Sequence, residues 1–462
     1  MKLRNLSAVA IITLLLAAAC TPAATTGPGG TAVAGSPAPG SPASTVAATP
    51  APPNPHEPGA DLGERVIGPD EPIHIAMWGV LTGSDAALGI DVQRGVEIAV
   101  EDRPELLGHE VSLTSEDAEC KPEGGNTVAT RLASDTTLVG LIGSVCSDET
   151  VGGIAQVTAA GLTTISPSNT RPALTAENRD DTYDGYLRTA HNDLFQGAAA
   201  AQFVFEELGL TKAATIHDNS SYAQALQGVF ADEFRAMGGT ITLQTAVGAD
   251  DTDMSSVLTN VASTSPEIIY YPVFTAPFGF ITAQSKQIPG LENVELMAAD
   301  GSFSAAAIEA GGDNALGAYL SSPDTRQFPG GYPAFLEKYV AKYGTNPEQI
   351  FHAHAYDATN ILFDAIEAVA EEGTDGSLTI SLGALRDEIY ATENFPGLTG
   401  SLTCDDFGDC GAPAIGVYEI TQEIVDDPQG NWPPAAIWPE LDTPTGSPGA
   451  GGSPETSPAT TP

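Results

Sequence analysis

The chain has 462 residues, of which 42% are hydrophobic, and its 60 acidic and 17 basic residues give a formal charge of −43. This length is sufficient for two packed domains rather than one. The charge argues against nucleic acid as a partner, because phosphates would be repelled, and against electrostatic adsorption to anionic lipid. It is compatible with a ligand that is neutral, zwitterionic or cationic.

The amino-terminal residues have the pattern of an export signal. Lys2 and Arg4 precede an apolar run at residues 8–19, which is too short to span a membrane, and Cys20 follows directly. A cysteine after small residues resembles a bacterial lipobox, although leucine is more usual than Ala17 at its position. We expect residues 1–20 to be a lipoprotein signal peptide and Cys20 to become the lipidated first residue. An ordinary secretory signal is the alternative.

Two segments of low complexity flank the rest of the chain. Residues 21–70 and 441–462 are rich in Pro, Ala, Thr, Gly and Ser and offer little apolar surface to bury. Such composition predicts disorder. We therefore expect the first segment to be a tether from the membrane and the second a disordered tail.

Between these segments, short apolar runs alternate with amphipathic ones. Strands are expected at 73–78, 111–115, 138–142, 162–166, 213–218, 240–245, 267–272 and 294–299, and helices at 92–100, 127–133, 195–208, 223–237, 255–262, 277–287 and 355–370. Long β-α alternation predicts parallel sheets covered by helices on both faces. About 300 such residues should divide into two α/β lobes.

The stretch from Gly140 to Thr170 contains two of these strands and the polar residues that follow them. Ser147 stands where a helix N-cap would be, and Ser168 and Thr170 follow the second strand. The carboxyl ends of parallel strands meet at one edge of a sheet, where ligands bind in open α/β folds. Hydroxyls and free amides there suit the carboxylate of a small molecule. Alternatively, these residues only form a cap and a polar turn.

Four cysteines remain once Cys20 is set aside. Export permits disulfides, and four cysteines allow three pairings. Cys404 and Cys410 flank a short turn-like insert, which favours their pairing and leaves Cys120 with Cys146. A bridged Cys146 is not a nucleophile, so this pairing argues against a thiol enzyme.

A family resemblance covers about residues 72–425. It is carried by IHIAMWGVLTGSDAALGIDVQRGVEIAVED, EDAECKPEGGNTVATRLASD, VGLIGSVCSDETVGGIAQVTAAGLTTISPSNTRPALT, YLRTAHNDLFQGAAAAQFV, ATIHDNSSYAQALQGVFADEF, EIIYYPVF and MAADGS. These segments resemble, in order, the branched-chain amino acid binding proteins of ABC transporters, which are type I periplasmic binding proteins.

The resemblance implies two doubly wound parallel-sheet lobes joined by a three-strand hinge that closes over ligand. The chain would cross between them near Thr189, Ser321 and Pro396. The expected division is 71–190 with 321–395 for lobe 1, and 191–320 with 396–440 for lobe 2.

The resemblance also implies a carboxylate site on lobe 1, made by Ser147, Ser168 and Thr170. One departure concerns Asp148 and Glu149, because less acidic residues are common there in the family. Two carboxylates in the first turn of a helix satisfy its dipole themselves. They would weaken an anion site unless they point to solvent.

The other lobe would bind the ligand's ammonium group through Asp300, although Asp-Gly also makes turns. Tyr222 and Phe274 are implied as aromatic walls, with Phe274 replacing a tyrosine. Trp78 could shape the side-chain pocket or belong to the core, and Leu88 stands where tyrosine is frequent.

His352, His354 and Asp357 could be interpreted as metal ligands. On a helix, two residues two positions apart point about 200° away from each other, so the histidines could not chelate together. No metal, cofactor or catalytic residue is expected, since the nucleophile and phosphate-binding motifs of enzymes are missing from the sequence.

The sequence thus predicts an extracytoplasmic, lipid-anchored, monomeric binding protein. It would deliver a small amino acid, branched-chain or otherwise aliphatic, to a membrane ABC permease. An amide- or urea-sensing module of the same fold and an exported hydrolase are the alternatives.

Overall fold

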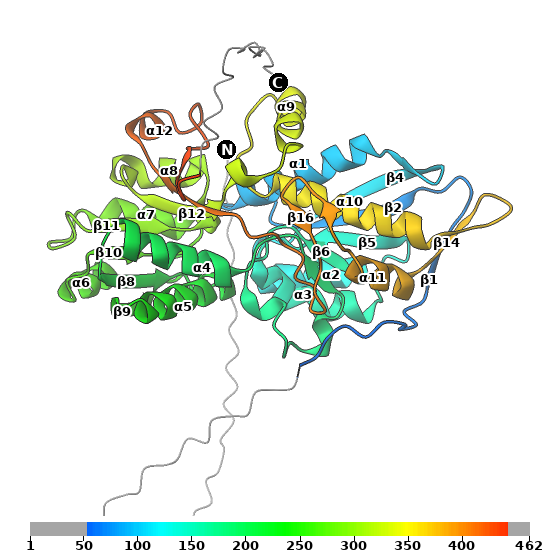
Figure 1. Cartoon of the computed structure of the whole chain (residues 1–462), viewed down its shortest axis with the longest axis horizontal. Coiled ribbons are helices and arrows are strands. Elements are labelled where there is room, and N and C mark those ends of the chain that lie inside the picture. The colour runs from blue at the N-terminus through cyan, green and yellow to red at the C-terminus, as the bar shows by residue number, and fades with distance from the viewer. Residues whose placement is uncertain (1–52, 442–462) are drawn as a thin grey trace, which may run out of the picture. The chain divides into compact units, whose positions relative to one another are not determined.

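The computed structural model describes residues 53–441 (Figure 1). The predicted signal peptide, Cys20, most of the tether and the tail beyond residue 441 lie outside these residues. The described part contains two parallel α/β lobes, as the alternation of strands and helices predicted. Among the described residues, no helix is both long and apolar enough to cross a membrane.

Lobe 1 is built on a six-stranded sheet with the order β3-β4-β2-β5-β6-β7. All neighbouring strands are parallel except the short β3. Helices α1 and α10 cover one face, and α2 and α3 cover the other. The strands are β2 (Ile73–Gly79), β3 (Glu105–Leu106), β4 (His109–Asp117), β5 (Leu138–Gly143), β6 (Thr164–Ser166) and β7 (Tyr186–Arg188). The helices are α1 (Ala86–Asp102), α2 (Pro122–Ser134), α3 (Ser147–Ala159), α9 (Tyr332–Tyr343), α10 (His352–Val369) and α11 (Leu382–Tyr390).

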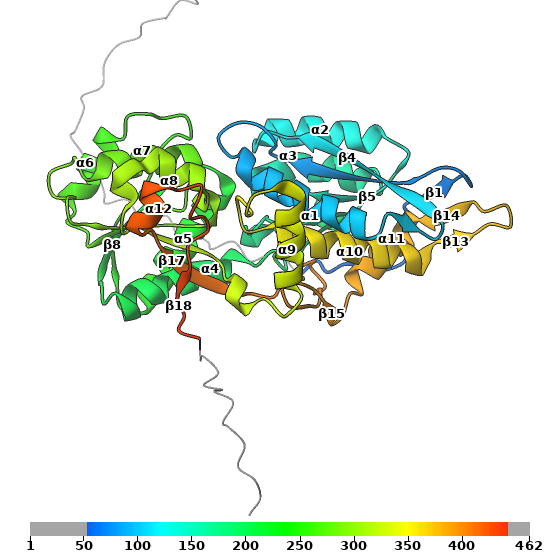
Figure 2. The ribbon, with the colours of Figure 1, turned by 90° about the horizontal axis from the view of Figure 1, so that it is seen from above.

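Lobe 2 is built on a seven-stranded sheet with the order β18-β17-β12-β11-β10-β8-β9. Its central strands are parallel, and β17 and β18 extend one edge antiparallel. Helices α4 and α5 lie on one face and α6, α7 and α8 on the other (Figure 2). The strands are β8 (Lys212–His217), β9 (Thr240–Ala246), β10 (Ile268–Tyr270), β11 (Glu295–Ala298), β12 (Tyr319–Pro323), β17 (Ile415–Glu419) and β18 (Ala436–Trp438). The helices are α4 (Asp193–Gln202), α5 (Ser221–Ala236), α6 (Ser255–Ser263), α7 (Thr275–Ser285), α8 (Ala305–Gly311) and α12 (Gln422–Asp426).

The chain passes between the lobes three times, and two passages differ from the expected positions. The first lies between β7 and α4, close to the expected Thr189. Strand β12 stays in the lobe 2 sheet through Pro323, beyond the expected crossover at Ser321. After Pro396, the amides of Leu398 and Thr399 still donate to Asp357 of lobe 1, and the chain rejoins lobe 2 only at β17. The cause is an intervening hairpin of β15 (Phe395–Pro396) and β16 (Ser401–Leu402), which sequence periodicity does not reveal.

Some residues before position 70, where the tether was expected to end, are part of the fold. Strand β1 (Glu64–Ile67) pairs with β14 (Leu378–Ser381), which also pairs with β13 (Glu371–Glu372). Ahead of it, His56 bonds to Asp184 and Asp387 with its two ring nitrogens and stacks on Tyr390. The last part of the expected tether is therefore attached to lobe 1.

Candidate functional site

A cavity between the lobes brings together most of the predicted ligand-binding residues. Its lining comprises Leu88, Val145, Cys146, Ser147, Ser168, Tyr222, Phe274, Asp300 and Gly301. Five of these are among the predicted contacts: Ser147 and Ser168 from lobe 1, and Tyr222, Phe274 and Asp300 from lobe 2. Segments far apart in the sequence thus face one small space. None of the lining residues has a basic side chain.

On the lobe 1 side, α3 begins one residue earlier than expected. Cys146, not Ser147, occupies the N-cap position, and Ser147 is the first helical residue. The side chain of Glu149 turns back and accepts hydrogen bonds from the amides of Cys120 (2.8 Å), Val145 (3.0 Å) and Cys146 (2.8 Å). A glutamate at the third helical position makes the return bond of a capping box. Ser147 is thus free of the capping role and remains at the cavity.

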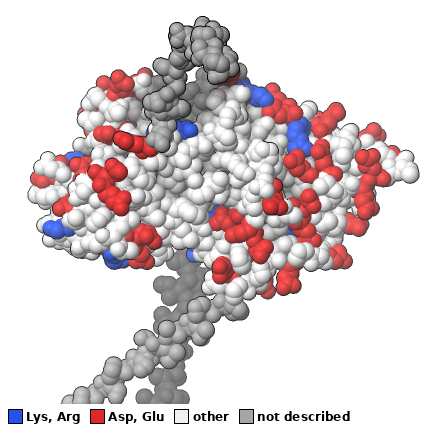
Figure 3. Space-filling view, viewed as in Figure 1, with Lys and Arg blue, Asp and Glu red and all other residues white. Residues whose placement is uncertain are grey.

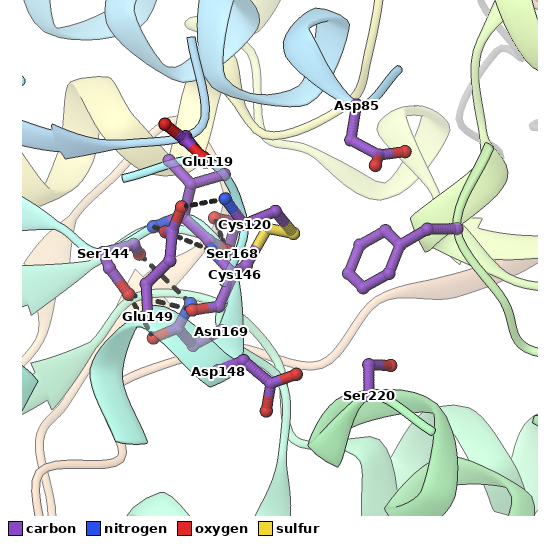
Figure 4. Close-up of a disulfide and its surroundings, with 12 residues drawn as sticks. Asp85, Glu119, Cys120, Ser144, Cys146, Asp148, Glu149, Ser168, Asn169 and Ser220 are labelled. Carbon is purple, nitrogen blue, oxygen red and sulfur yellow. Dashed lines mark hydrogen bonds between the residues drawn. A yellow bond between two sulfur atoms is a disulfide. The ribbon is translucent and has the colours of Figure 1, made fainter. Parts of the chain in front are cut away.

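The anion site was expected to be weakened unless Asp148 and Glu149 point to solvent. Asp148 is half-buried, whereas Glu149 does not point to solvent. Glu149 is fully buried, and burial raises its pKa to about 7. Asp148 reaches the other lobe, where the Ser221 amide donates to it. Each carboxylate is therefore occupied by backbone amides away from the cavity. Figure 4 shows Glu149 beside the disulfide and Asp148 directed toward Ser220.

Both expected disulfides are present, one of them at the cavity. Cys120–Cys146 joins the loop before α2 to the N-cap of α3 (Figure 4). Cys404–Cys410 closes a turn. The backbones of α2 and α3 also approach closely, because a Cβ on Gly125 would lie 2.2 Å from the carbonyl oxygen of Glu149. Together these contacts fix the position of the α3 amino terminus.

On the lobe 2 side, Asp300 is buried and held by two donors. Gln196 Nε2 donates to Asp300 Oδ1 over 2.6 Å, and the Tyr222 hydroxyl donates to the same oxygen over 2.8 Å. Burial raises the pKa of Asp300 despite the nearby His191 and these donors. The Phe274 ring lies 5.3 Å from that of Tyr222, between centroids, and completes an aromatic wall. A buried carboxylate beside aromatic rings suits a cationic group.

Sequence reasoning missed a second buried carboxylate, Asp193, at the start of α4. Both its oxygens are buried and make no hydrogen bond within residues 53–441. Burial and then the charge of Asp300 raise its pKa well above the usual value. The sequence signal for Asp193 was the pair Asn192-Asp193 directly after the first crossover. The same pair is also typical of an ordinary helix start.

Two predicted residues are not among those that line the cavity. Thr170 is buried with an unpaired hydroxyl, and its carbonyl accepts the Asp193 amide. Trp78 is fully buried in the lobe 1 core, and its indole N–H donates to Thr164 over 3.1 Å. Trp78 was expected either to shape the side-chain pocket or to belong to the core, and its contacts are those of a core residue.

The residues once considered as metal ligands have separate structural partners. His352 contacts Asp91 and Tyr332, whereas Asp357 accepts bonds from Leu398 and Thr399. Burial and then the nearby histidines lower the pKa of His354 well below its usual value. The His354 ring packs edge-to-face against Phe328, with centroids 5.6 Å apart, so the three side chains contact different neighbours.

Comparison with known proteins agrees with this architecture. The family model described as "Periplasmic binding protein" matches residues 72–409, most of the chain. The chain therefore belongs to the periplasmic binding protein family, and its fold is the type I form, α/β with two parallel-sheet lobes. The family consists of binding proteins rather than enzymes.

Individual relatives are moderately similar. An amino acid binding protein of Pseudomonas aeruginosa is 27% identical over 59% of this chain and 73% of its own length. Leu/Ile/Val-binding protein homolog 3 of Brucella melitensis is 25% identical over 75% of this chain and 91% of its own. The structure of the leucine binding protein LivK from Thermotoga maritima superposes with a TM-score of 0.68 at 26% identity, covering 76% of this chain and 96% of that one.

Proposed function

We propose that the protein is an extracytoplasmic, lipid-anchored solute-binding protein that captures a small aliphatic amino acid and delivers it to an ABC permease. The relatives named for leucine, isoleucine and valine binding support an amino acid ligand. The observation that carries the proposal is the arrangement of groups around the small space between the lobes, with hydroxyl groups on lobe 1 and a buried carboxylate on lobe 2. A zwitterion would bridge these two sides.

In this arrangement Ser147 and Ser168 would face the α-carboxylate, with Thr170 behind them, and Asp300 would bind the α-ammonium. The Ser168 hydroxyl already donates to the Val145 carbonyl over 2.8 Å. Ser147 and backbone amides would therefore provide the donors. Leu88, Val145 and Phe274 are apolar and would surround a side chain without charge.

The direct test is to identify small molecules that co-purify with the native protein by mass spectrometry. Calorimetric titration would follow, with leucine, isoleucine, valine, alanine and acetamide. We expect the branched-chain amino acids to bind and acetamide not to. Preference for acetamide would instead support an amide sensor, and hydrolysis of a ligand would support an enzyme.

The proposed anchoring makes a separate prediction. Cys20→Ser should release the protein from membranes into the soluble fraction, because the lipid acceptor is lost. Fractionation followed by immunodetection measures this, and ligand affinity should not change. Unaltered retention on membranes would show that Cys20 is not the anchor.

A further inference from the structure

Two carboxylates of lobe 1 reach across to lobe 2 outside the cavity described above. Asp148, in the first turn of α3, accepts the Ser221 amide at 3.1 and 3.3 Å with its two oxygens. Asp85, at the N-cap position of α1, accepts the Thr275 amide at 3.0 Å. Figure 4 shows both carboxylates directed away from the disulfide. Each is a direct contact between the lobes.

Both acceptors meet the first residue of a lobe 2 helix. Ser221 begins α5 and Thr275 begins α7. The amide of a first helical residue has no partner in its own helix and lies at the positive end of the helix dipole. A carboxylate is therefore a well-matched partner for it.

Neither carboxylate is needed by the helix to which it belongs. Asp85 makes no side-chain cap bond to α1, and at α3 the amides of Cys146 and Val145 are bound by Glu149. The remaining oxygen of Asp85 accepts the Ser84 hydroxyl over 2.9 Å, which orients the carboxylate. These groups are thus available for a role between the lobes.

The two contact points on lobe 2 are joined by the buried Asp218. One of its oxygens accepts the Ser220 amide over 3.0 Å, and the other accepts the Phe274 amide over 2.9 Å. The residues directly before Ser221 and Thr275 are therefore held together. Both contacts with lobe 1 act on one connected part of lobe 2.

We propose that Asp85 and Asp148 are closure latches, which form when the lobes close and break when they open. They border a separate cavity of about 440 Å³ whose lining comes from both lobes. Because they favour the closed form without contacting ligand, they increase the affinity for every ligand by the same factor. The effect on ligand affinity rests on the proposed function. The existence of the latches does not depend on that function.

The latches can be tested without any ligand, by amide hydrogen exchange resolved to single residues. In the full-length protein, Asp148→Ala should accelerate exchange at Ser221, and Asp85→Ala should accelerate exchange at Thr275. Glu123→Ala is the matched control, because Glu123 lies in the first turn of α2 but is exposed. It should change neither amide. Equal exchange in wild type and both latch variants would overturn the proposal.

Affinity provides the second measurement. Each alanine variant should raise the dissociation constants of leucine and valine about 3- to 10-fold, and the double variant about 10- to 100-fold. The factor should be equal for both amino acids. Asp85→Asn and Asp148→Asn keep an acceptor oxygen and should lose less affinity than the alanine variants. Unequal factors would show that these residues act on the ligand and would overturn the latch role. If no amino acid binds the wild type, the proposed function fails while the exchange test still decides the latches.

Discussion

Replacing Asp300 by asparagine is expected to weaken amino acid binding about 10- to 150-fold, which corresponds to about 1.5–3 kcal/mol for a buried charge-assisted contact. Asparagine keeps the size of the side chain and an oxygen that can accept from Gln196 and Tyr222. Only the negative charge opposite the ligand's ammonium is lost. Calorimetric titration of leucine against wild type and variant measures the effect.

Measuring the free energy of unfolding of Asp300→Asn distinguishes a loss of binding from a loss of folding. Asp193 and Asp300 are two buried carboxylates whose pKa values are both raised, Asp193 in part by the charge of Asp300. Removing one of them relieves this repulsion, so the free energy of unfolding should stay the same or increase. Asp250→Asn is the control, because it removes an exposed charge that borders the larger cavity. If Asp300→Asn bound leucine with wild-type affinity, Asp300 would be a turn residue and not a ligand contact.

Replacing Glu149 by alanine is expected to lower the free energy of unfolding by about 3 kcal/mol, since two buried amides and one partly buried amide lose their acceptor. Urea denaturation measures this loss. An unchanged midpoint in Glu149→Ala would contradict the role of Glu149 in holding the α3 amino terminus.

The pH dependence of this effect has a definite sign. Burial raises the pKa of Glu149 from 4.5 to about 7, so the folded protein holds this proton more tightly than the unfolded chain does. This contribution to stability is present in full below about pH 4.5 and is lost as the pH rises through about 7. The difference in stability between wild type and Glu149→Ala should therefore shrink over this interval. If the free energies of unfolding of the two proteins changed in parallel with pH, the raised pKa of Glu149 would be contradicted.

Local pattern predicted the strands and the edge of the sheet at which the site lies. Strand β5 is buried along its whole length, as a parallel strand covered on both faces must be, and Ser147 and Ser168 follow two adjacent strands. Asp300 could be placed opposite them only through the family resemblance, because it belongs to the other sheet. Their meeting in one cavity depends on how the lobes pack, which periodicity does not encode.

The residues whose direction sequence reasoning left open are those that depend on a distant neighbour. Asp148 and Glu149 are adjacent in one helical turn, yet one contacts lobe 2 and the other is enclosed by the loop at Cys120. Trp78 ends a strand near the site, but its side chain enters the face covered by α2 and α3. In each case tertiary contacts, rather than local propensity, determine where the side chain lies.

Acidic side chains gather on the half of the face in Figure 3 where Figure 1 places lobe 1. This agrees with the overall charge of −43 and with a strongly hydrated surface.

The attachment of His56 and β1 to lobe 1 determines which half of the protein a membrane anchor would restrain. With Cys20 anchored as proposed, the link to the bilayer enters the fold through lobe 1 alone. Lobe 2 would then be connected to the membrane only through the hinge and lobe 1.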